Sequence, residues 1–272
     1  MSIDVPRRWA LAAFAGTPIA GWVQARPASR IPRGYDQVDP RTARRVPLWQ
    51  ELAGSNPIFP DDPQFSWRTW TTVEQSGYLL EQITSLGTHT GTHISAPAHF
   101  HDGAKFLSEL DETFSLMPLA VIDVRARIAD SNGDFALGTD DLKRWERRHG
   151  TFPARGCVLL LTGFSGHYSG ATGPGPADDY FDPAPGFDAD ATAWLADTRG
   201  VFAVGSDTFG PDASADADFG STSTILAKGG ITVENVGPGL ARMRPYGDWI
   251  SINGARPHFS GFQMGITGFT LP

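Results

Sequence analysis

Four of the seven histidines of this 272-residue chain lie within thirteen consecutive residues, between His89 and His101. Histidine is the commonest metal ligand and the usual general base near neutral pH. The residues between the histidines are mostly small or apolar, which is not the composition of a solvated polar tail. The cluster, with His93 and His99 inside it, therefore predicts a site that binds a metal or moves protons.

The spacing of His89 and His93 matches the helical zinc motif, but the residues between them do not. That motif needs a glutamate where Thr90 stands, and Gly91 and Pro97 disfavour a helix. A straight strand would hold the two outer α-carbons about 13 Å apart, which is wide for one ion bonded at about 2.1 Å. Gly91 can bend the backbone so that the two imidazoles converge. We therefore expect a kinked loop that presents both rings.

The elements that position this loop follow from local patterns. Strands are expected where β-branched and apolar residues gather, at 66–86, 120–124, 157–162, 201–204, 231–235 and 262–269. Helices are expected at 139–149, capped by Thr139, at 188–199, and over a short stretch at 47–53. Helices and strands alternate only in the middle of the chain. We therefore expect an α/β fold, as a single domain with a mixed β-sheet or barrel-like core.

Composition limits the partners and the chemistry. The chain has 22 basic and 30 acidic residues and no basic stripe, so we expect neither nucleic acid nor a membrane surface as a partner. The single cysteine, Cys157, excludes an internal disulfide and a cysteine metal cluster. Its apolar neighbours predict that it packs in a buried strand.

The N-terminal residues 1–25 are typical of an export signal. Arg7 and Arg8 precede an uncharged stretch, in an order that suits the twin-arginine route for folded proteins. The alternative is an ordinary N-terminal helix docked on the domain. We expect two segments, an export signal at 1–25 and a catalytic domain at 26–272. The expected location is the periplasm or the exterior, with the cytoplasm as the alternative.

The string from His89 to His99 resembles the signature of the cyclase family of metal-dependent hydrolases, which includes bacterial kynurenine formamidases and isatin hydrolases. That signature is H-x-G-T-H-x-D-x-P-x-H, and further similarity at 121–124, 157–163, 204–208 and 230–235 extends the resemblance over most of the chain after residue 25. The resemblance implies a swivelling β/β/α fold, a homodimer or larger homo-oligomer, and a small-molecule substrate. It also implies hydrolysis of an amide, lactam or lactone by water activated on a divalent metal, zinc or manganese.

Residue by residue, the resemblance implies that His89 and His93 are metal ligands. It implies that His99 is the proton shuttle, and that Glu234 is the late acidic residue of the site. Ser95 stands where the family has a ligating aspartate. A second departure is Thr222, which stands where the family has a histidine twelve residues before the glutamate.

These two departures bear on the metal, because a neutral hydroxyl is a weak ligand. A one-metal site of His89, His93 and Glu234 stays open, as does a site without metal. The first hypothesis is thus a metal-dependent hydrolase of a small cyclic or aryl amide, lactam or lactone. The alternative is a relative that binds a small molecule, or performs a cyclisation by metal-free acid–base chemistry.

Three further residues are candidates for contact with the substrate. They are Thr222, Asp207 and His101. Asp207 follows a predicted strand and could equally cap the turn there. The alternative for His101 is a solvent-facing side chain.

Overall fold

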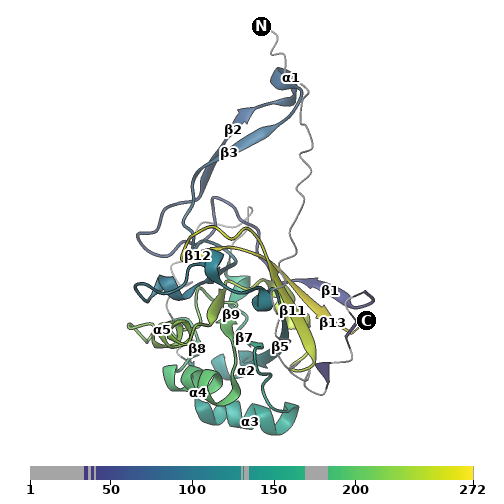
Figure 1. Ribbon diagram of the computed structural model, residues 1–272, viewed down its shortest axis with the longest axis vertical. Helices are drawn as coiled ribbons and strands as arrows, with labels where there is room; N and C mark the ends of the chain where they lie inside the picture. Colours follow the sequence, from purple (N-terminus) through teal and green to yellow (C-terminus); the bar gives the residue numbers. More distant parts are fainter. Residues whose placement is uncertain are drawn as a thin grey trace, which may run out of the picture. The chain divides into compact units, whose positions relative to one another are not determined.

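A nine-stranded sheet organises the computed structural model of this chain, which describes residues 34–35, 38–39, 41–129, 131, 135–168 and 183–271 (Figure 1). The strand order is β1-β13-β11-β5-β7-β9-β10-β4-β12, with β5, β7, β9 and β10 parallel and the other pairings antiparallel. The strands are β1 (Arg44–Pro47), β4 (His93–Ser95), β5 (Leu116–Asp123), β7 (Cys157–Leu161), β9 (Ala203–Ser206), β10 (Ile231–Glu234), β11 (Asp248–Asn253), β12 (Gly261–Gln263) and β13 (Gly265–Thr270). The expectation of an α/β domain with a curled mixed sheet is confirmed.

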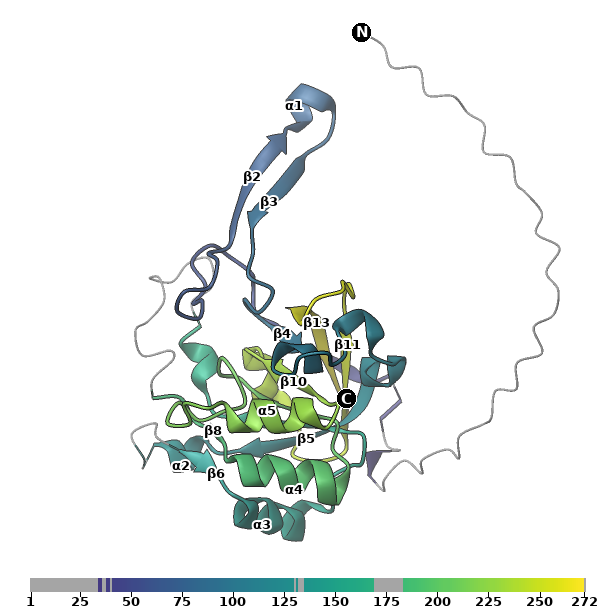
Figure 2. The same cartoon turned by 60° about the vertical axis from the view of Figure 1, so that its left-hand side comes forward.

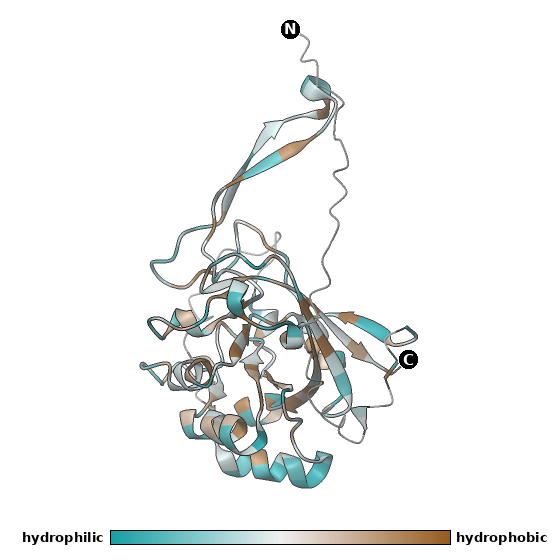
Figure 3. Ribbon diagram, viewed as in Figure 1, coloured by the Kyte–Doolittle hydropathy of each residue, from teal (hydrophilic) through white to brown (hydrophobic). Residues whose placement is uncertain are grey.

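Helices lie on the outer side of the parallel strands (Figure 2). They are α2 (Arg125–Ile128), α3 (Thr139–His149), α4 (Ala189–Arg199) and α5 (Gly220–Ala227). Elsewhere in the fold there are 3-10 helices, namely η2 (Pro97–His99), η3 (Leu107–Glu109), η4 (Glu112–Ser115), η5 (Phe164–Gly166) and η6 (Pro238–Arg242). Leu142 of α3 and Leu195 of α4 are fully buried against Leu160 of β7 and its neighbours. The central strands of the sheet are mostly apolar in Figure 3, whereas α3 is mostly hydrophilic. Removal of this apolar surface from water stabilises the layered arrangement.

Several local expectations are confirmed and others are corrected. Helix α3 has the expected bounds, but its N-cap is Gly138 and not Thr139. Cys157 is completely buried in β7, as expected. The helix expected at 47–53 is wrong, because Pro47 ends strand β1 and Leu48 N–H donates to Ile266 O of the neighbouring segment. The single late strand expected at 262–269 is divided into β12 and β13.

A separate hairpin precedes the histidine cluster. It consists of β2 (Ser66–Thr71) and β3 (Leu80–Ser85), joined by α1 (Val73–Ser76); a second small sheet pairs β6 (Ala136–Leu137) with β8 (Gly186–Phe187). Both views show the hairpin extending away from the nine-stranded sheet (Figures 1 and 2). Its large apolar side chains are 46% to 64% exposed, namely Trp67, Trp70, Val73, Tyr78, Leu79, Leu80 and Ile83. A two-stranded ribbon of this kind has little intrinsic stability in water, and its apolar surface suits contact with a partner.

The expected export signal at 1–25 lies outside the described residues. Within the part of the chain that the structure describes, no helix has the length and apolarity needed to cross a membrane.

Candidate active site

Strand register brings the histidine motif to the late glutamate. Strand β4 lies between β10 and β12, with His93 opposite Glu234 and Ser95 opposite Thr232. Directly opposed side chains on one face of an antiparallel pair lie close enough to interact. Sheet pairing thus brings Ser95 and Glu234 into contact although their positions in the sequence differ by 139. Ser95 Oγ donates to Glu234 Oε1 at 2.8 Å.

Two glycines allow the imidazoles to converge. Gly91 has a φ of +73°, in the left-handed region that favours glycine, so the kink expected at this position is present. It brings the ring centroids of His89 and His93 to 5.1 Å. On β12, a Cβ at Gly261 would lie only 2.3 Å from Cε1 of His89. The position of the His89 ring therefore requires glycine at residue 261.

A chain of hydrogen bonds fixes the protons around His89. Because the hydroxyl proton of Ser95 goes to Glu234, the contact of 3.1 Å between Ser95 Oγ and His89 Nδ1 requires an N–H on Nδ1. Burial, followed by the charges of His93 and His99, lowers the pKa of His89 to about 3, so the ring is neutral. Its Nε2 then accepts from Ser260 Oγ at 3.0 Å. Both nitrogens of His89 are therefore occupied by serine hydroxyls.

His93 and Glu234 form a buried ion pair. His93 Nδ1 donates to Gly91 O at 2.8 Å, which directs Nε2 toward Glu234 Oε2 at 3.3 Å. Burial alone would lower the pKa of His93, but the Glu234 carboxylate outweighs it and raises that pKa. Burial would likewise raise the pKa of Glu234, but the charge of His93 and the hydroxyl of Thr232 hold it well below its usual value. Glu234 is thus a fixed negative charge.

His99 is the histidine of the cluster that is free to exchange a proton. Its ring stacks on His89 with centroids 3.8 Å apart, and neither ring nitrogen forms a hydrogen bond to the described residues. Burial lowers the pKa of His99, and this effect outweighs the opposing charge of Glu234. A neutral imidazole with a free lone pair can act as a general base.

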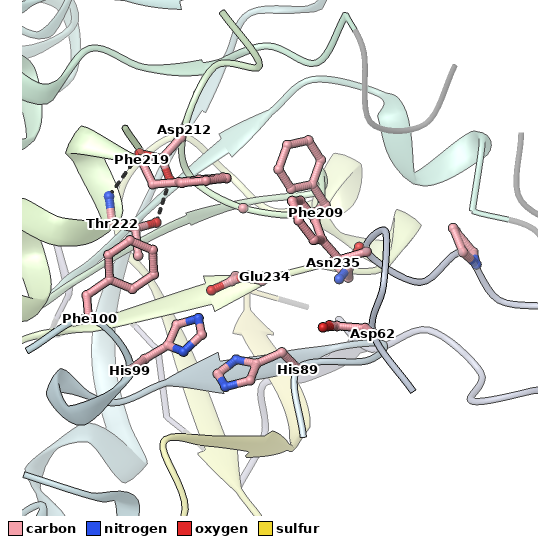
Figure 4. Close-up of a pocket in the computed structure, with 13 residues that line it drawn as sticks. Asp62, His89, His99, Phe100, Phe209, Asp212, Phe219, Thr222, Glu234 and Asn235 are labelled. Carbon is pink, nitrogen blue, oxygen red and sulfur yellow. Dashed lines mark hydrogen bonds between the residues drawn. The ribbon is translucent and has the colours of Figure 1, made fainter. Parts of the chain in front are cut away.

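A cavity of about 250 Å³ opens above these side chains (Figure 4). His89 and His99 lie at one side of it, and Glu234 lies between them and the opposite side. Four phenylalanines line its walls, namely Phe59, Phe100, Phe209 and Phe219, and their rings contact one another. A pocket with aromatic walls and a few polar groups suits a small aromatic ligand.

The cavity lining contains two carboxyl residues that the sequence did not point to, Asp62 and Asp212. Asp212 lies in the loop after β9; its Oδ1 accepts from the N–H of Thr222 at 3.0 Å, and its Oδ2 accepts from the Thr222 hydroxyl. Burial raises the pKa of Asp212 to about 6, and the charge of Glu234 adds to this effect. The position of Asp212 shortly after an expected parallel strand could have indicated it, since ligand sites of α/β sheets lie at the carboxyl ends of parallel strands.

The other sequence-predicted residues have distinct positions. Thr222 lines the cavity, on helix α5. Asp207 lies apart from the cavity lining, where its carboxylate accepts from the N–H groups of Thr162 and Gly163 and holds the turn after β7. His101 is also absent from the lining, and its Nε2–H donates to Ser223 O at 2.8 Å.

The residues present do not fit the metal centre that the family resemblance implies. Among the described residues, no group of three or more His, Cys, Asp or Glu side chains is arranged to hold an ion. Ser95 and Thr222 replace an anionic and an imidazole ligand, and both hydroxyls donate to carboxylates. The ring of His89 offers no unused lone pair. An ion would therefore have to displace this network of hydrogen bonds.

Comparisons with known proteins agree with this fold. A family model named Cyclase matches residues 40–213. The kynurenine formamidase of Bacillus mycoides (strain KBAB4) is 28% identical over 196 residues, which cover 72% of this chain and 83% of that relative. Isatin hydrolase A from Ralstonia solanacearum superposes with a TM-score of 0.73 at 25% identity, over 84% of this chain and 92% of that one. A "predicted metal-dependent hydrolase" from Bacillus stearothermophilus, which is 17% identical, superposes with a TM-score of 0.61 over 83% of this chain and 98% of that one.

Proposed function

The chain belongs to the cyclase family, and we propose that it hydrolyses the amide or lactam bond of a small aromatic compound. The relatives described above are named as a formamidase and as hydrolases, and isatin is an aromatic lactam. The observation that carries the proposal is the position of His99, a neutral base with free ring nitrogens, beside a cavity with four phenylalanines. A lactone or aryl ester would be attacked in the same way.

In this proposal, a water molecule between His99 and the substrate carbonyl is the nucleophile. A ring nitrogen of His99 takes a proton as the water oxygen bonds to the carbonyl carbon. The ion pair of His93 and Glu234 does not exchange protons in this step, because each partner stabilises the charge of the other. It supplies a fixed field beside the reacting atoms.

The zinc or manganese expected from the family resemblance stays a prediction. A divalent metal is a general feature of relatives named as metal-dependent hydrolases. In such proteins the ion supplies activated water. In this chain the donors described above are hydrogen-bonded to one another, so we propose that the side chains activate the water themselves.

The test is turnover by the purified wild-type protein of a panel of aromatic substrates that includes formanilide, isatin and a benzolactone. We expect turnover of at least one compound, and a loss of kcat of about 10²- to 10⁴-fold in His99→Gln, the usual contribution of a general base. His258→Gln is the matched control, because His258 is exposed and absent from the cavity lining. Tight binding of an aromatic compound without turnover would favour the alternative, a small-molecule binding protein.

We also propose that the protein is a homo-oligomer, exported from the cytoplasm. The oligomer is supported by the exposed apolar side chains on both faces of the β2–β3 hairpin, such as Trp67, Trp70 and Ile83. Export is supported by Arg7 and Arg8 ahead of the uncharged stretch. Export is tested by fractionation of cells that express the full chain, with detection of the protein in the periplasm or the medium.

A further inference from the structure

Asp212 faces the cavity beside Glu234. In Figure 4, Asp212 and Thr222 lie on one side, His89 and His99 on the other, and Glu234 between them. A Cβ at Gly210 would lie 3.9 Å from Asp212 Oδ2 and 3.9 Å from Glu234 Oε2. The two oxygens are therefore at most twice that distance apart, and Gly210 leaves the space between them open. Both residues line the cavity that a substrate would fill.

The surroundings of these two carboxyl groups differ. Glu234 accepts hydrogen bonds from Ser95 and Thr232 and faces the imidazolium of His93, so it is held as an anion. Asp212 is only 1% exposed, yet forms no ion pair with a cationic side chain among the described residues. A buried carboxyl group without a cation holds its proton more tightly, in agreement with its raised pKa. Two carboxyl groups in such unlike environments suit unlike roles in one reaction.

A structural role for Asp212 also has to be considered. Its carboxylate accepts the N–H of Thr222 in the first turn of α5, and therefore caps that helix. Asp216 caps the same helix, since its Oδ2 accepts from the N–H of Gly220 at 2.9 Å. Asp216 is absent from the cavity lining, whereas Asp212 is part of it. Capping alone does not explain why one of the two carboxyl groups faces the substrate volume.

We propose that Asp212 is the general acid of this site, and the proposal rests on the hydrolysis proposed above. His99 takes one proton from water as the water oxygen bonds to the carbonyl carbon. The carbon–nitrogen bond of the resulting tetrahedral adduct then breaks, and the carboxyl proton of Asp212 passes to the leaving nitrogen. The products are a carboxylic acid and an amine. The proton on His99 returns to Asp212 through solvent, which restores the starting state without any oxidant or further reactant.

The role of an acid depends on the leaving group, and this dependence supplies the test. An anilide nitrogen must be protonated as it leaves, whereas 4-nitrophenolate leaves as a stable anion. Formanilide and 4-nitrophenyl formate carry the same formyl group. We expect Asp212→Asn to lower kcat on formanilide by about 10²- to 10⁴-fold and to change kcat on the ester by less than about fivefold. The asparagine Oδ1 still accepts from Thr222 N–H, so the helix cap is retained.

Asp216→Asn is the matched control, with the same chemical change at the other cap of α5 and no expected effect on either substrate. Equal losses on both substrates in Asp212→Asn would overturn the acid role and indicate a structural one. An unchanged rate on formanilide would overturn it as well. If the wild type hydrolysed the ester but not formanilide, Asp212 would have no leaving nitrogen to protonate. That result would overturn the acid role of Asp212 but not the proposed hydrolysis. Wild-type inactivity on every substrate would instead overturn the proposed hydrolysis, and the acid role with it.

Discussion

The carboxyl group of Asp212 should reduce the stability of the folded protein at neutral pH. Burial raises its pKa from 3.8 to about 6. Between these two values the folded state binds more protons than the unfolded state, so the free energy of unfolding falls as the pH rises. A shift of about two pKa units corresponds to about 3 kcal/mol. That contribution is fully present below pH 3.8 and is lost above about pH 6.

Asp212→Asn removes this titration and keeps an acceptor for Thr222 N–H. The neutral amide gives up a charge-assisted hydrogen bond, at a cost of about 1 kcal/mol. At pH 8 we therefore expect the free energy of unfolding of Asp212→Asn to exceed that of the wild type by about 2 kcal/mol, which corresponds to a Tm higher by roughly 4–8 °C for a domain of this size. At pH 4 the wild-type carboxyl group is protonated, and the gain should vanish.

Urea unfolding of the wild type, Asp212→Asn and Asp216→Asn at pH 4, 6 and 8 measures this effect. The control variant should follow the pH dependence of the wild type, because Asp216 is only partly buried and lies outside the cavity. Lower stability of Asp212→Asn than of the wild type at pH 8 would refute the reasoning. It would mean that the carboxylate stabilises the fold more than its burial opposes it. A gain in stability together with loss of activity is typical of a functional group.

Three further outcomes follow from the site and the hairpin. Ser95→Asp restores the carboxylate of the family pattern, so elemental analysis should find more zinc or manganese per chain than in the wild type; equal occupancy would show that this residue does not limit metal binding. Gly261→Ala places a Cβ 2.3 Å from Cε1 of His89, and this overpacking should lower the free energy of unfolding by about 1–3 kcal/mol in urea titration. An unchanged midpoint would mean that the ring moves aside without strain. The double variant Trp67→Glu/Ile83→Lys exchanges an exposed cross-strand apolar pair for opposite charges, so the hairpin should be retained while the proposed homo-oligomer should dissociate in analytical ultracentrifugation. An unchanged mass would place the subunit interface elsewhere.

The sequence by itself determined the elements whose signals are local. The first turn of α3 carries Asp140 and Asp141, its end is followed by Gly150, and its bounds agree with the expectation from the sequence. The kink of the histidine loop follows from Gly91, since glycine adopts positive φ at little cost. Helix α5 was not expected, because its N-cap Phe219 has no capping side chain and its caps come from Asp212 and Asp216 in the preceding loop. Local patterns do not contain such contacts.

Only the tertiary structure decided which protons and charges the site contains. Ser260 lies 171 residues from His89, yet its hydroxyl occupies the nitrogen that a metal would need. Asp212 reaches the cavity because the loop after β9 returns to the carboxyl end of β10, where Glu234 lies. The residue types that can do chemistry are visible in a sequence, but their pKa values depend on burial and on neighbours that sheet pairing brings together from distant parts of the chain.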